Sequence, residues 1–429
     1  MRRIIVAYSG GADSLALLHA MCALRERLAP TELSAVHVHH GLHDQADEWL
    51  DGCARACTAL DVSLEVIRVD AAADTGESPE AAARQARYEA LEKLPGVDEA
   101  VCTAHHQRDQ AETVLLQLLR GAGAAGLAAM PALAPLGRGW LVRPLLDTCP
   151  RALRDYLVRN GVEWSEDPSN ADRRFDRNYL RHEVFPLLER RWPGVHRTLA
   201  RAAAHQADSV ALAADLAELD VHDARGRAPG TLSAGGLLRL SPPRARNLLR
   251  FWLSERGLSA PTAAHLERIL TELVGAREDA EPLVCWPGAE VRRYRDDVHA
   301  GPAMPAHDGS WVVAWNPGDP LELPLGRLEA VSVEGRGLDV ERCRGARVEV
   351  RFRQGGERFQ PAGRAHSTSL KKLLQESGVP PWLRERIPLV YVDDALAAVA
   401  GLWVARTFAA AEGRPGWVLT WSVLAGHRA

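Results

Sequence analysis

The sequence has no apolar run long enough to cross a membrane. A signal-peptide core is also missing, because Asp13 and the pair Gly10-Gly11 interrupt the apolar residues near the start. The hydrophobic content of 46% and the charged content of 25% are those of an ordinary globular protein. We therefore expect a cytoplasmic enzyme or binding protein with no membrane partner.

Paired cysteines are missing as well, since the seven cysteines include no C-x-x-C motif. This pattern gives no support to a thiolase that works through such a pair. Cys53 and Cys57 lie one helical turn apart, which would suit a metal ion only if other ligands joined them. We expect buried free thiols.

Lysine is scarce, with only Lys93, Lys371 and Lys372 in the chain, so nearly all basic residues are arginine. The net charge of -4 does not indicate a nucleic-acid partner. Residues 341–372, however, carry nine basic residues against three acidic ones, a local charge of +6. This stretch is either an anion-facing surface or a solvated charged face, and charge alone favours neither.

Apolar runs and helical patterns alternate over the first 105 residues. The apolar runs are Ile4–Ala7, Ser34–His39, Ser63–Val69 and Glu99–Ala104, and the helical patterns start near Leu15, Asp47 and Glu80. The alternation predicts an α/β fold, a Rossmann-like parallel sheet with helices on both faces. In such sheets ligands bind at the carboxyl ends of the strands.

Three domains are expected from the change of pattern along the chain. Residues 1–215 form the catalytic α/β domain, which ends in a mainly helical stretch. Residues 216–339 form a mainly helical middle domain that later turns strand-like. Residues 340–429 form a small α+β domain with one helix near 370–377.

The stretch Y-S-G-G-A-D-S, from Tyr8 to Ser14, joins the first strand to the first helix. Its glycines free backbone N–H groups, which converge on an anion together with the positive end of the helix. It is not a Walker A loop, which needs a lysine, nor a G-x-G-x-x-G loop. Ser9 and Ser14 add hydroxyl donors, whereas Asp13 would repel phosphate unless a divalent cation lay between them.

We therefore predict an ATP site in which Asp13 contacts Mg²⁺ and ATP is cleaved at its α-phosphate. The predicted nucleotide-binding residues of this loop are Ser9, Gly10, Gly11, Ala12, Asp13 and Ser14. The alternative is an ordinary turn in which Asp13 caps the helix.

The S-G-G-A-D-S motif resembles the PP-loop of the ATP pyrophosphatases, and longer runs resemble the tRNA(Ile)-lysidine synthetases. These runs are HVHHGLH at His37, EAAARQARYEAL at Glu80, HHQRDQAETVLLQLLRGAGAAGLAAM at His105, RPLL at Arg143, EDPSNADRRFDRNYLRHEVFPLL at Glu166, RQGGERF at Arg353 and SLKKLLQESGVPPWLRERIPLVY at Ser369. They cover most of the chain and leave only the middle region thinly matched. A non-catalytic RNA-binding module is the rival interpretation, and the intact PP-loop argues against it.

The resemblance implies a definite reaction and definite partners. ATP adenylates O2 of the wobble cytidine in isoleucine tRNA with a CAU anticodon. The ε-amine of free L-lysine then attacks C2, which gives lysidine and AMP and changes decoding from AUG to AUA. The oligomeric state stays open, with a homodimer as one option.

The attacking amine must lose a proton, which costs about 4.6 kcal/mol at pH 7 for an ordinary pKa of about 10.4. Asp109 and Glu112 are the candidates for gripping lysine or aiding this transfer, because they lie three residues apart at a helix start. Asp109 could instead contact magnesium, and both could simply favour the helix N-terminus. The family commonly has Asp or Asn where this chain has Arg108, so the prediction rests on Asp109 more than on a pair.

Histidines and arginines near the strand ends complete the predicted nucleotide site. His39 and His105 are expected to line it, with a metal centre or plain packing as the alternatives for His39. By resemblance, Arg84 or Arg87 contacts a nucleotide phosphate or the adenylate, and we assign Arg84 to the catalytic group. Surface ion pairing is the alternative.

Basic residues in two later stretches are candidates for binding the tRNA. Arg177, Asn178 and Arg181 belong to a run of arginines at near-helical spacing, which suits a polyanion or the departing pyrophosphate. An exposed salt-bridged helix is the alternative. In the basic stretch near the end of the chain, Arg358, Lys371 and Lys372 are expected to hold tRNA phosphates.

Overall fold

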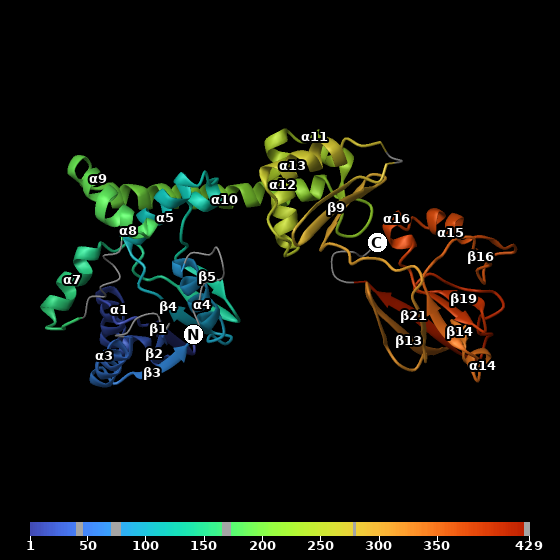
Figure 1. The fold of residues 1–429 in the computed structure, drawn as a ribbon, viewed down its shortest axis with the longest axis horizontal. Coiled ribbons are helices and arrows are strands. Elements are labelled where there is room, and N and C mark those ends of the chain that lie inside the picture. The colour runs from blue at the N-terminus through green and yellow to red at the C-terminus, as the bar shows by residue number, and fades with distance from the viewer. Residues whose placement is uncertain (40–45, 70–78, 165–172, 278–279, 424–429) are drawn as a thin grey trace. The chain divides into compact units, whose positions relative to one another are not determined.

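The computed structural model describes residues 1–39, 46–69, 79–164, 173–277 and 280–423, without the side chains of residues 46 and 79–81 (Figure 1). The chain divides into two compact units, Met1–Leu212 and Ala213–Ala429. Each unit is described by itself.

Unit 1 is built on a six-stranded sheet with the order β3-β2-β1-β4-β6-β5. The strands are β1 (Arg3–Ala7), β2 (Glu32–His39), β3 (Ser63–Arg68), β4 (Glu99–Cys102), β5 (Leu133–Leu136) and β6 (Gly139–Val142). All neighbours pair in parallel except β5 and β6, which form an antiparallel edge. The carboxyl ends of β1, β2, β4 and β6 therefore meet at one edge of the sheet.

Helices connect these strands and follow them along the chain, and the last of them continues past Leu212 into unit 2. They are α1 (Ala12–Ala23), α2 (Arg25–Leu28), α3 (Ala46–Ala59), α4 (Pro79–Glu92), α5 (Gln107–Leu119), α6 (Ala124–Leu127), α7 (Pro150–Arg159), α8 (Asp176–Tyr179), α9 (Phe185–Arg191) and α10 (Val195–Asp223), with a π-helical turn, η2 (Leu180–Val184), between α8 and α9. Figure 1 shows α1 and α3 beside the parallel strands. The α/β fold class predicted from the alternating pattern is confirmed.

Two apolar cores hold the sheet between its helices. Val6 and other residues on one face pack with Leu18 of α1 and Leu157 of α7, whereas Ile5 on the other face packs with Leu91 of α4. Successive β1 side chains thus enter opposite cores, as expected for a central parallel strand. Each fully buried aliphatic side chain contributes roughly 1.5–3 kcal/mol, and these contacts hold the carboxyl end of β1 in place.

Unit 2 begins with helices packed on a four-stranded antiparallel sheet of order β7-β10-β9-β8. The strands are β7 (Leu232–Ser233), β8 (Leu283–Trp286), β9 (Ala289–Tyr294) and β10 (Asp297–Gly301), and the helices are α11 (Ala234–Arg239), α12 (Pro242–Glu255), α13 (Ala263–Arg268) and the π-helical η3 (Ile269–Leu273). A shared core includes Leu248 and Leu253 of α12 and Val291 of β9.

The rest of unit 2 contains two larger antiparallel sheets, a two-stranded sheet and three short helices. The sheets have the orders β11-β15-β18-β19-β20, β12-β13-β21-β14 and β16-β17. The strands are β11 (Val312–Ala314), β12 (Leu321–Leu323), β13 (Gly326–Glu334), β14 (Leu338–Asp339), β15 (Val348–Arg351), β16 (Arg358–Phe359), β17 (Thr368–Ser369), β18 (Leu389–Val392), β19 (Ala395–Val399), β20 (Trp403–Val404) and β21 (Pro415–Ser422), and the helices are α14 (Val340–Cys343), α15 (Leu370–Glu376) and α16 (Pro381–Arg384). The predicted helix near 370–377 is thus α15. None of the described helices is both long and apolar enough to span a bilayer.

Candidate active site

The loop between β1 and α1 has the backbone geometry of an anion cradle. Gly10 has φ +89°, which other residues rarely adopt, and a Cβ atom there would lie 3.1 Å from Cys53 Sγ. Gly11 is the N-cap of α1 and offers no side chain to the N–H groups of the first turn. The alternative in which Asp13 caps the helix is therefore wrong, and these N–H groups can donate to a phosphate.

Two serine hydroxyls close this loop. Ser14 Oγ donates to the carbonyl oxygen of Gly11 at 3.0 Å and lies 3.1 Å from Ser9 Oγ. The backbone N–H of Ser9 donates to Ser14 Oγ at 3.3 Å. The predicted loop residues are thus held together by their own hydrogen bonds, and a hydroxyl can rotate its proton toward a ligand.

A second strand-to-helix junction, between β4 and α5, lies next to the first. His106 is the N-cap of α5, and its backbone N–H donates to Asp109 Oδ2 at 3.0 Å. Its imidazole Nδ1 lies 3.1 Å from the same oxygen, and Nε2 lies 3.4 Å from Asp13 Oδ2. One histidine therefore connects Asp13 of the loop with Asp109 of α5.

The charges at this junction stabilise one another. Burial alone would lower the pKa of His106, but the hydrogen bond to Asp13 and the charges of Asp109 and Asp13 raise that pKa above its ordinary value. Burial would likewise raise the pKa of Asp109, whereas the neighbouring His106 and Arg181 hold it below its ordinary value. The Asp109 carboxylate is therefore kept ionised, which makes it an electrostatic partner for a cation and a weak proton acceptor.

Glu112 lies one turn further along α5 with a side-chain exposure of 0%. Arg181 from η2 contacts both of its oxygens, with Nε at 2.8 Å from Oε1 and Nη2 at 3.0 Å from Oε2. Arg177 Nε lies 3.4 Å from Oε2, and Arg108 Nε lies 3.3 Å from Oε1. Arg181 also reaches Asp109 Oδ1 at 3.4 Å. Three guanidinium groups thus surround one buried carboxylate.

This cluster places several predicted residues in an unexpected setting. Arg177 and Arg181, predicted to face the tRNA or pyrophosphate, point their guanidinium groups at Glu112. Arg108, which departs from the family pattern, supplies the third cation. Glu112 has no exposed surface, and the described contacts of its carboxylate are with these arginines and not with the pocket beside the β1–α1 loop.

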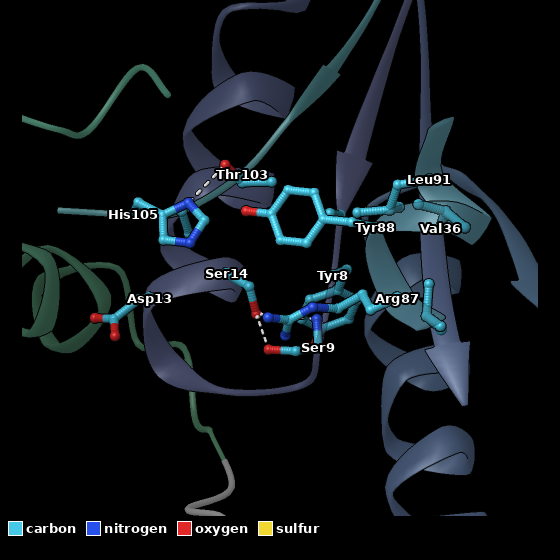
Figure 2. A pocket seen from close by; sticks show the side chains of 13 residues that line it. Tyr8, Ser9, Asp13, Ser14, Val36, Arg87, Tyr88, Leu91, Thr103 and His105 are labelled. Carbon is cyan, nitrogen blue, oxygen red and sulfur yellow. Dashed lines mark hydrogen bonds between the residues drawn. The ribbon is translucent and has the colours of Figure 1, made fainter. Parts of the chain in front are cut away.

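A pocket of about 200 Å³ opens beside Ser9 and Ser14 (Figure 2). The other residues lining it come from β1 and the loop after it, from β2, from α4 and from the end of β4, namely Ala7, Tyr8, Asp13, Val36, Val38, Arg87, Tyr88, Leu91, Thr103, Ala104 and His105. His105 Nδ1 lies 2.8 Å from Thr103 Oγ1. Burial and the nearby arginine charges lower the pKa of His105 to about 3, although Asp109 opposes them, so the imidazole is neutral at pH 7.

Other predicted residues lie close to this edge of the sheet. His39 is buried at the end of β2, with Nε2 3.3 Å from Asp47 Oδ1, and is not among the residues that line the pocket. Arg84 lies over the ring of Tyr88, with Cζ 5.0 Å from its centroid. Asn178 is part of α8. His40 and Asn170 lie outside the described residues.

The basic stretch of residues 341–372 is largely neutralised by ion pairs. The pairs are Arg344 with Glu341, Arg347 and Arg351 with Glu349 and Asp394, Arg353 with Glu357, and Arg364 and Lys372 with Glu376. Among the described residues, Arg342, Arg358 and Lys371 have no acidic partner. Arg358 Nη2 donates to the carbonyl oxygen of Ser367 at 3.0 Å.

Sequence reasoning gave no role to three residues that shape this site, His106, Thr103 and Tyr88. A signal was present for His106, since it precedes an acidic residue by three positions at a helix start, the spacing of a reciprocal cap. Thr103 and Tyr88 carried no such signal. They belong to different elements, and only the tertiary fold brings both to the pocket.

The loop suits a magnesium ion that is shared with a nucleotide. Mg²⁺ usually binds through one or two carboxylates together with substrate phosphates. The side chain of Asp13 is 43% exposed and lies beside the predicted phosphate cradle. Within the described ranges, no cluster of three or more His, Cys, Asp or Glu side chains could hold an ion by itself. The residues therefore fit an ion brought in with the triphosphate.

Comparison with known proteins gives three domain matches and many full-length relatives. Residues 1–188 match a PP-loop domain, residues 232–299 a TilS substrate binding domain and residues 348–421 a TilS substrate C-terminal domain. The tRNA(Ile)-lysidine synthase of Methylococcus capsulatus is 45% identical and aligns over 97% of this chain and 95% of its own. The corresponding proteins of Coxiella burnetii and Alkalilimnicola ehrlichii are 42% and 45% identical, over 96% of this chain and over 91% and 92% of theirs.

Proposed function

This chain belongs to the tRNA(Ile)-lysidine synthase family, and from that premise we propose how its residues perform the reaction. It is an ATP-using ligase that forms lysidine in isoleucine tRNA. We propose that O2 of the wobble cytidine in a CAU anticodon attacks the α-phosphate of ATP and releases pyrophosphate. The ε-amine of free lysine then attacks C2, AMP leaves, and the anticodon reads AUA in place of AUG.

The PP-loop is proposed to hold the pyrophosphate portion of ATP. The N–H groups at the start of α1 and the hydroxyls of Ser9 and Ser14 donate to phosphate oxygens. Asp13 would hold a magnesium ion, which supplies positive charge for the developing negative charge on pyrophosphate. Asp13 also pairs with His106, so the loop is tied to the start of α5.

Asp109 is proposed to attract the ammonium group of lysine. Its lowered pKa keeps it negative, and its side chain retains 14% exposure, whereas Glu112 has none. Glu112 is then a positioning residue that fixes Arg181, and Arg181 in turn contacts Asp109. Arg84 and His105 are proposed to adjoin the nucleotide, because Arg84 stacks on Tyr88 of the pocket wall and His105 lines the pocket.

The tRNA is proposed to bind beyond the PP-loop domain as well. In unit 2, Arg358 and Lys371 have no acidic partner among the described residues, and Lys372 is 4.0 Å from Glu376. Cations of this kind can neutralise phosphates. For Arg177, Asn178 and Arg181 in unit 1, tRNA binding stays a prediction, and the two guanidinium groups are already paired with Glu112.

One observation carries the proposal: His106 lies within 3.4 Å of a carboxylate oxygen of both Asp13 and Asp109. This contact supports a site in which the nucleotide loop and the proposed lysine carboxylate lie at the same edge of the sheet. A reaction between ATP, a cytidine and lysine requires its substrates to be held close together.

The test is incorporation of radiolabelled lysine with ATP and magnesium into isoleucine tRNA transcripts that carry C or U at the wobble position. We expect label only in the C transcript, with one AMP and one pyrophosphate released per lysine. Label in neither transcript would refute the proposed substrate, and release of ADP in place of AMP would refute cleavage at the α-phosphate.

A further inference from the structure

Tyr88 has a polar group for which the protein provides no partner. Its hydroxyl is buried, and it makes no hydrogen bond to any of the described residues. Leaving a buried hydroxyl unpaired is unfavourable, so such groups usually bond to protein, water or a ligand. Tyr88 also lines the pocket beside the PP-loop. Figure 2 shows its ring reaching in from α4, with the hydroxyl directed to the side where Thr103 and His105 lie.

The surroundings of this hydroxyl suit a flat aromatic ligand. Val36 and Leu91 give the pocket an apolar wall at the end of Tyr88 opposite its hydroxyl, and Ser9 and Ser14 lie at another part of the same pocket (Figure 2). A pocket with an apolar wall and a few fixed polar groups is typical of sites for small heteroaromatic ligands. A nucleotide with its phosphates on the loop would therefore place its base in this pocket, within reach of Tyr88.

The ring of Tyr88 is held by its neighbours on α4. Arg84 Cζ lies 5.0 Å and Arg87 Cζ 5.9 Å from the ring centroid, within the range of cation–π attraction. These contacts use the faces of the ring and leave the hydroxyl free to bond. Two other polar side chains lie at this end of the pocket, Thr103 and His105; the imidazole of His105 is neutral, and its Nδ1 lies 2.8 Å from Thr103 Oγ1. A fixed hydroxyl beside a neutral imidazole can form hydrogen bonds with the uncharged polar atoms at the edge of a ligand's ring.

We propose that Tyr88 is a nucleotide-selecting residue whose hydroxyl hydrogen-bonds to the base of the bound ATP. The proposal rests on the ATP use described above and adds the group that recognises the base. The 6-amino group of adenine is the contact that we assign to it, because an amino donor satisfies the phenolic oxygen that the protein leaves unpaired.

The test measures equilibrium binding of ATP and of purine riboside triphosphate, which lacks the 6-amino group, to the full chain and to Tyr88→Phe. We expect Tyr88→Phe to weaken ATP binding about three- to tenfold, the size of one net hydrogen bond. The analogue should bind the unaltered chain more weakly than ATP by a similar factor, and Tyr88→Phe should not weaken it further. In the lysine assay, Tyr88→Phe should raise the KM for ATP. Its kcat should stay within about twofold of the value of the unaltered chain.

Tyr156→Phe is the matched control. This variant also loses one phenolic hydroxyl, which in the unaltered chain bonds to His19 at 2.8 Å. Because Tyr156 does not line the pocket, its replacement should leave ATP binding unchanged. Equal binding of ATP by Tyr88→Phe and the unaltered chain would overturn the proposal. So would a Tyr88→Phe change that weakens binding of purine riboside triphosphate as much as it weakens binding of ATP but leaves binding of 2′-deoxy-ATP unchanged, because the hydroxyl would then contact the ribose. A chain that binds ATP but transfers no lysine would defeat the proposed function and leave this binding test valid.

Discussion

Arginine is concentrated in two regions of this protein, and it does different work in each. Around Glu112, three arginines meet one fully buried carboxylate, and they come from α5 (Arg108), α8 (Arg177) and η2 (Arg181). In the basic stretch of residues 341–372, arginines pair with carboxylates both at the surface and below it, since Arg353 and Glu357 are only 15% and 10% exposed, and the contrast with Glu112 concerns the exposed pairs. Arg347, for example, is 57% exposed and its partner Asp394 65%.

The difference is one of desolvation. A buried carboxylate without its cations would be strongly unfavourable, so the partners around Glu112 are necessary to the fold. Exposed pairs contribute about 0–1 kcal/mol because water already stabilises both charges. The ion pairs around Glu112 therefore fix the positions of the side chains near α5. The ion pairs in residues 341–372 instead determine how much positive charge remains for binding a polyanion.

The largest effect should follow from Glu112→Gln. Removing this charge leaves Arg181, Arg177 and Arg108 facing one another without a counter-charge, and breaking a buried pair costs about 3–5 kcal/mol. Urea unfolding of the full chain should show a loss of about this size. Glu183→Gln is the matched control, because Glu183 is 40% exposed and pairs with one exposed arginine, and it should lose no more than about 1 kcal/mol. Equal losses would contradict the stabilising role given to the burial of Glu112.

Asp13→Asn should affect activity more than stability. Asp13 is 43% exposed, so the folded chain tolerates an amide there, but the amide brings no negative charge to a metal ion. We expect lysine incorporation to fall at least about 100-fold, equivalent to about 2.7 kcal/mol of lost transition-state stabilisation. The free energy of unfolding should change by less than about 1 kcal/mol. Full-rate incorporation by the variant would contradict the role given to Asp13.

We expect the pKa of His106 to lie above the ordinary value of histidine, because the imidazole contacts both Asp13 and Asp109. This effect is smaller than the loss of activity expected for Asp13→Asn. Because the pKa of His106 is raised in the folded chain, the stability that it contributes is present below its unfolded pKa of about 6.5 and is lost as pH rises through the folded value. Asp109→Asn should lower this pKa, which NMR of histidine-labelled protein can follow. His299 of β10 is the control, because its pKa is lowered to about 4 by burial and not by Asp109, and Asp109→Asn should leave that pKa unchanged. A His106 pKa that is unaffected by Asp109→Asn would exclude the proposed coupling.

The fold could be predicted to a large extent because its signals are local. Alternating apolar runs and helical patterns identified the parallel sheet, and the loop from Ser9 to Ser14 carried its chemistry in adjacent residues. The pairing of Arg181 with Glu112 could not be predicted, because the two are 69 positions apart and only packing brings them together. The unpaired hydroxyl of Tyr88 was likewise invisible, since a missing partner is a property of three-dimensional surroundings.

The charge of the basic stretch is a second property that the sequence alone does not predict. Counting within residues 341–372 gave +6, but the fold brings in Asp394 and Glu376 from outside that range to neutralise part of it. Net charge over a segment therefore overstates the positive charge that a tRNA can use.

The smallest effect should separate unpaired from paired cations in this stretch. Arg358→Ala with Lys371→Ala removes two cations that have no acidic partner among the described residues. Arg344→Ala with Arg347→Ala removes two that are ion-paired. If only unpaired cations contact phosphates, the first variant should lower the slope of log affinity against log salt by roughly one per lost contact, and the second should leave it nearly unchanged. Filter binding of isoleucine tRNA transcript at several salt concentrations measures both slopes, and equal slopes would mean that the tRNA displaces Glu341 and Asp394 from their arginines.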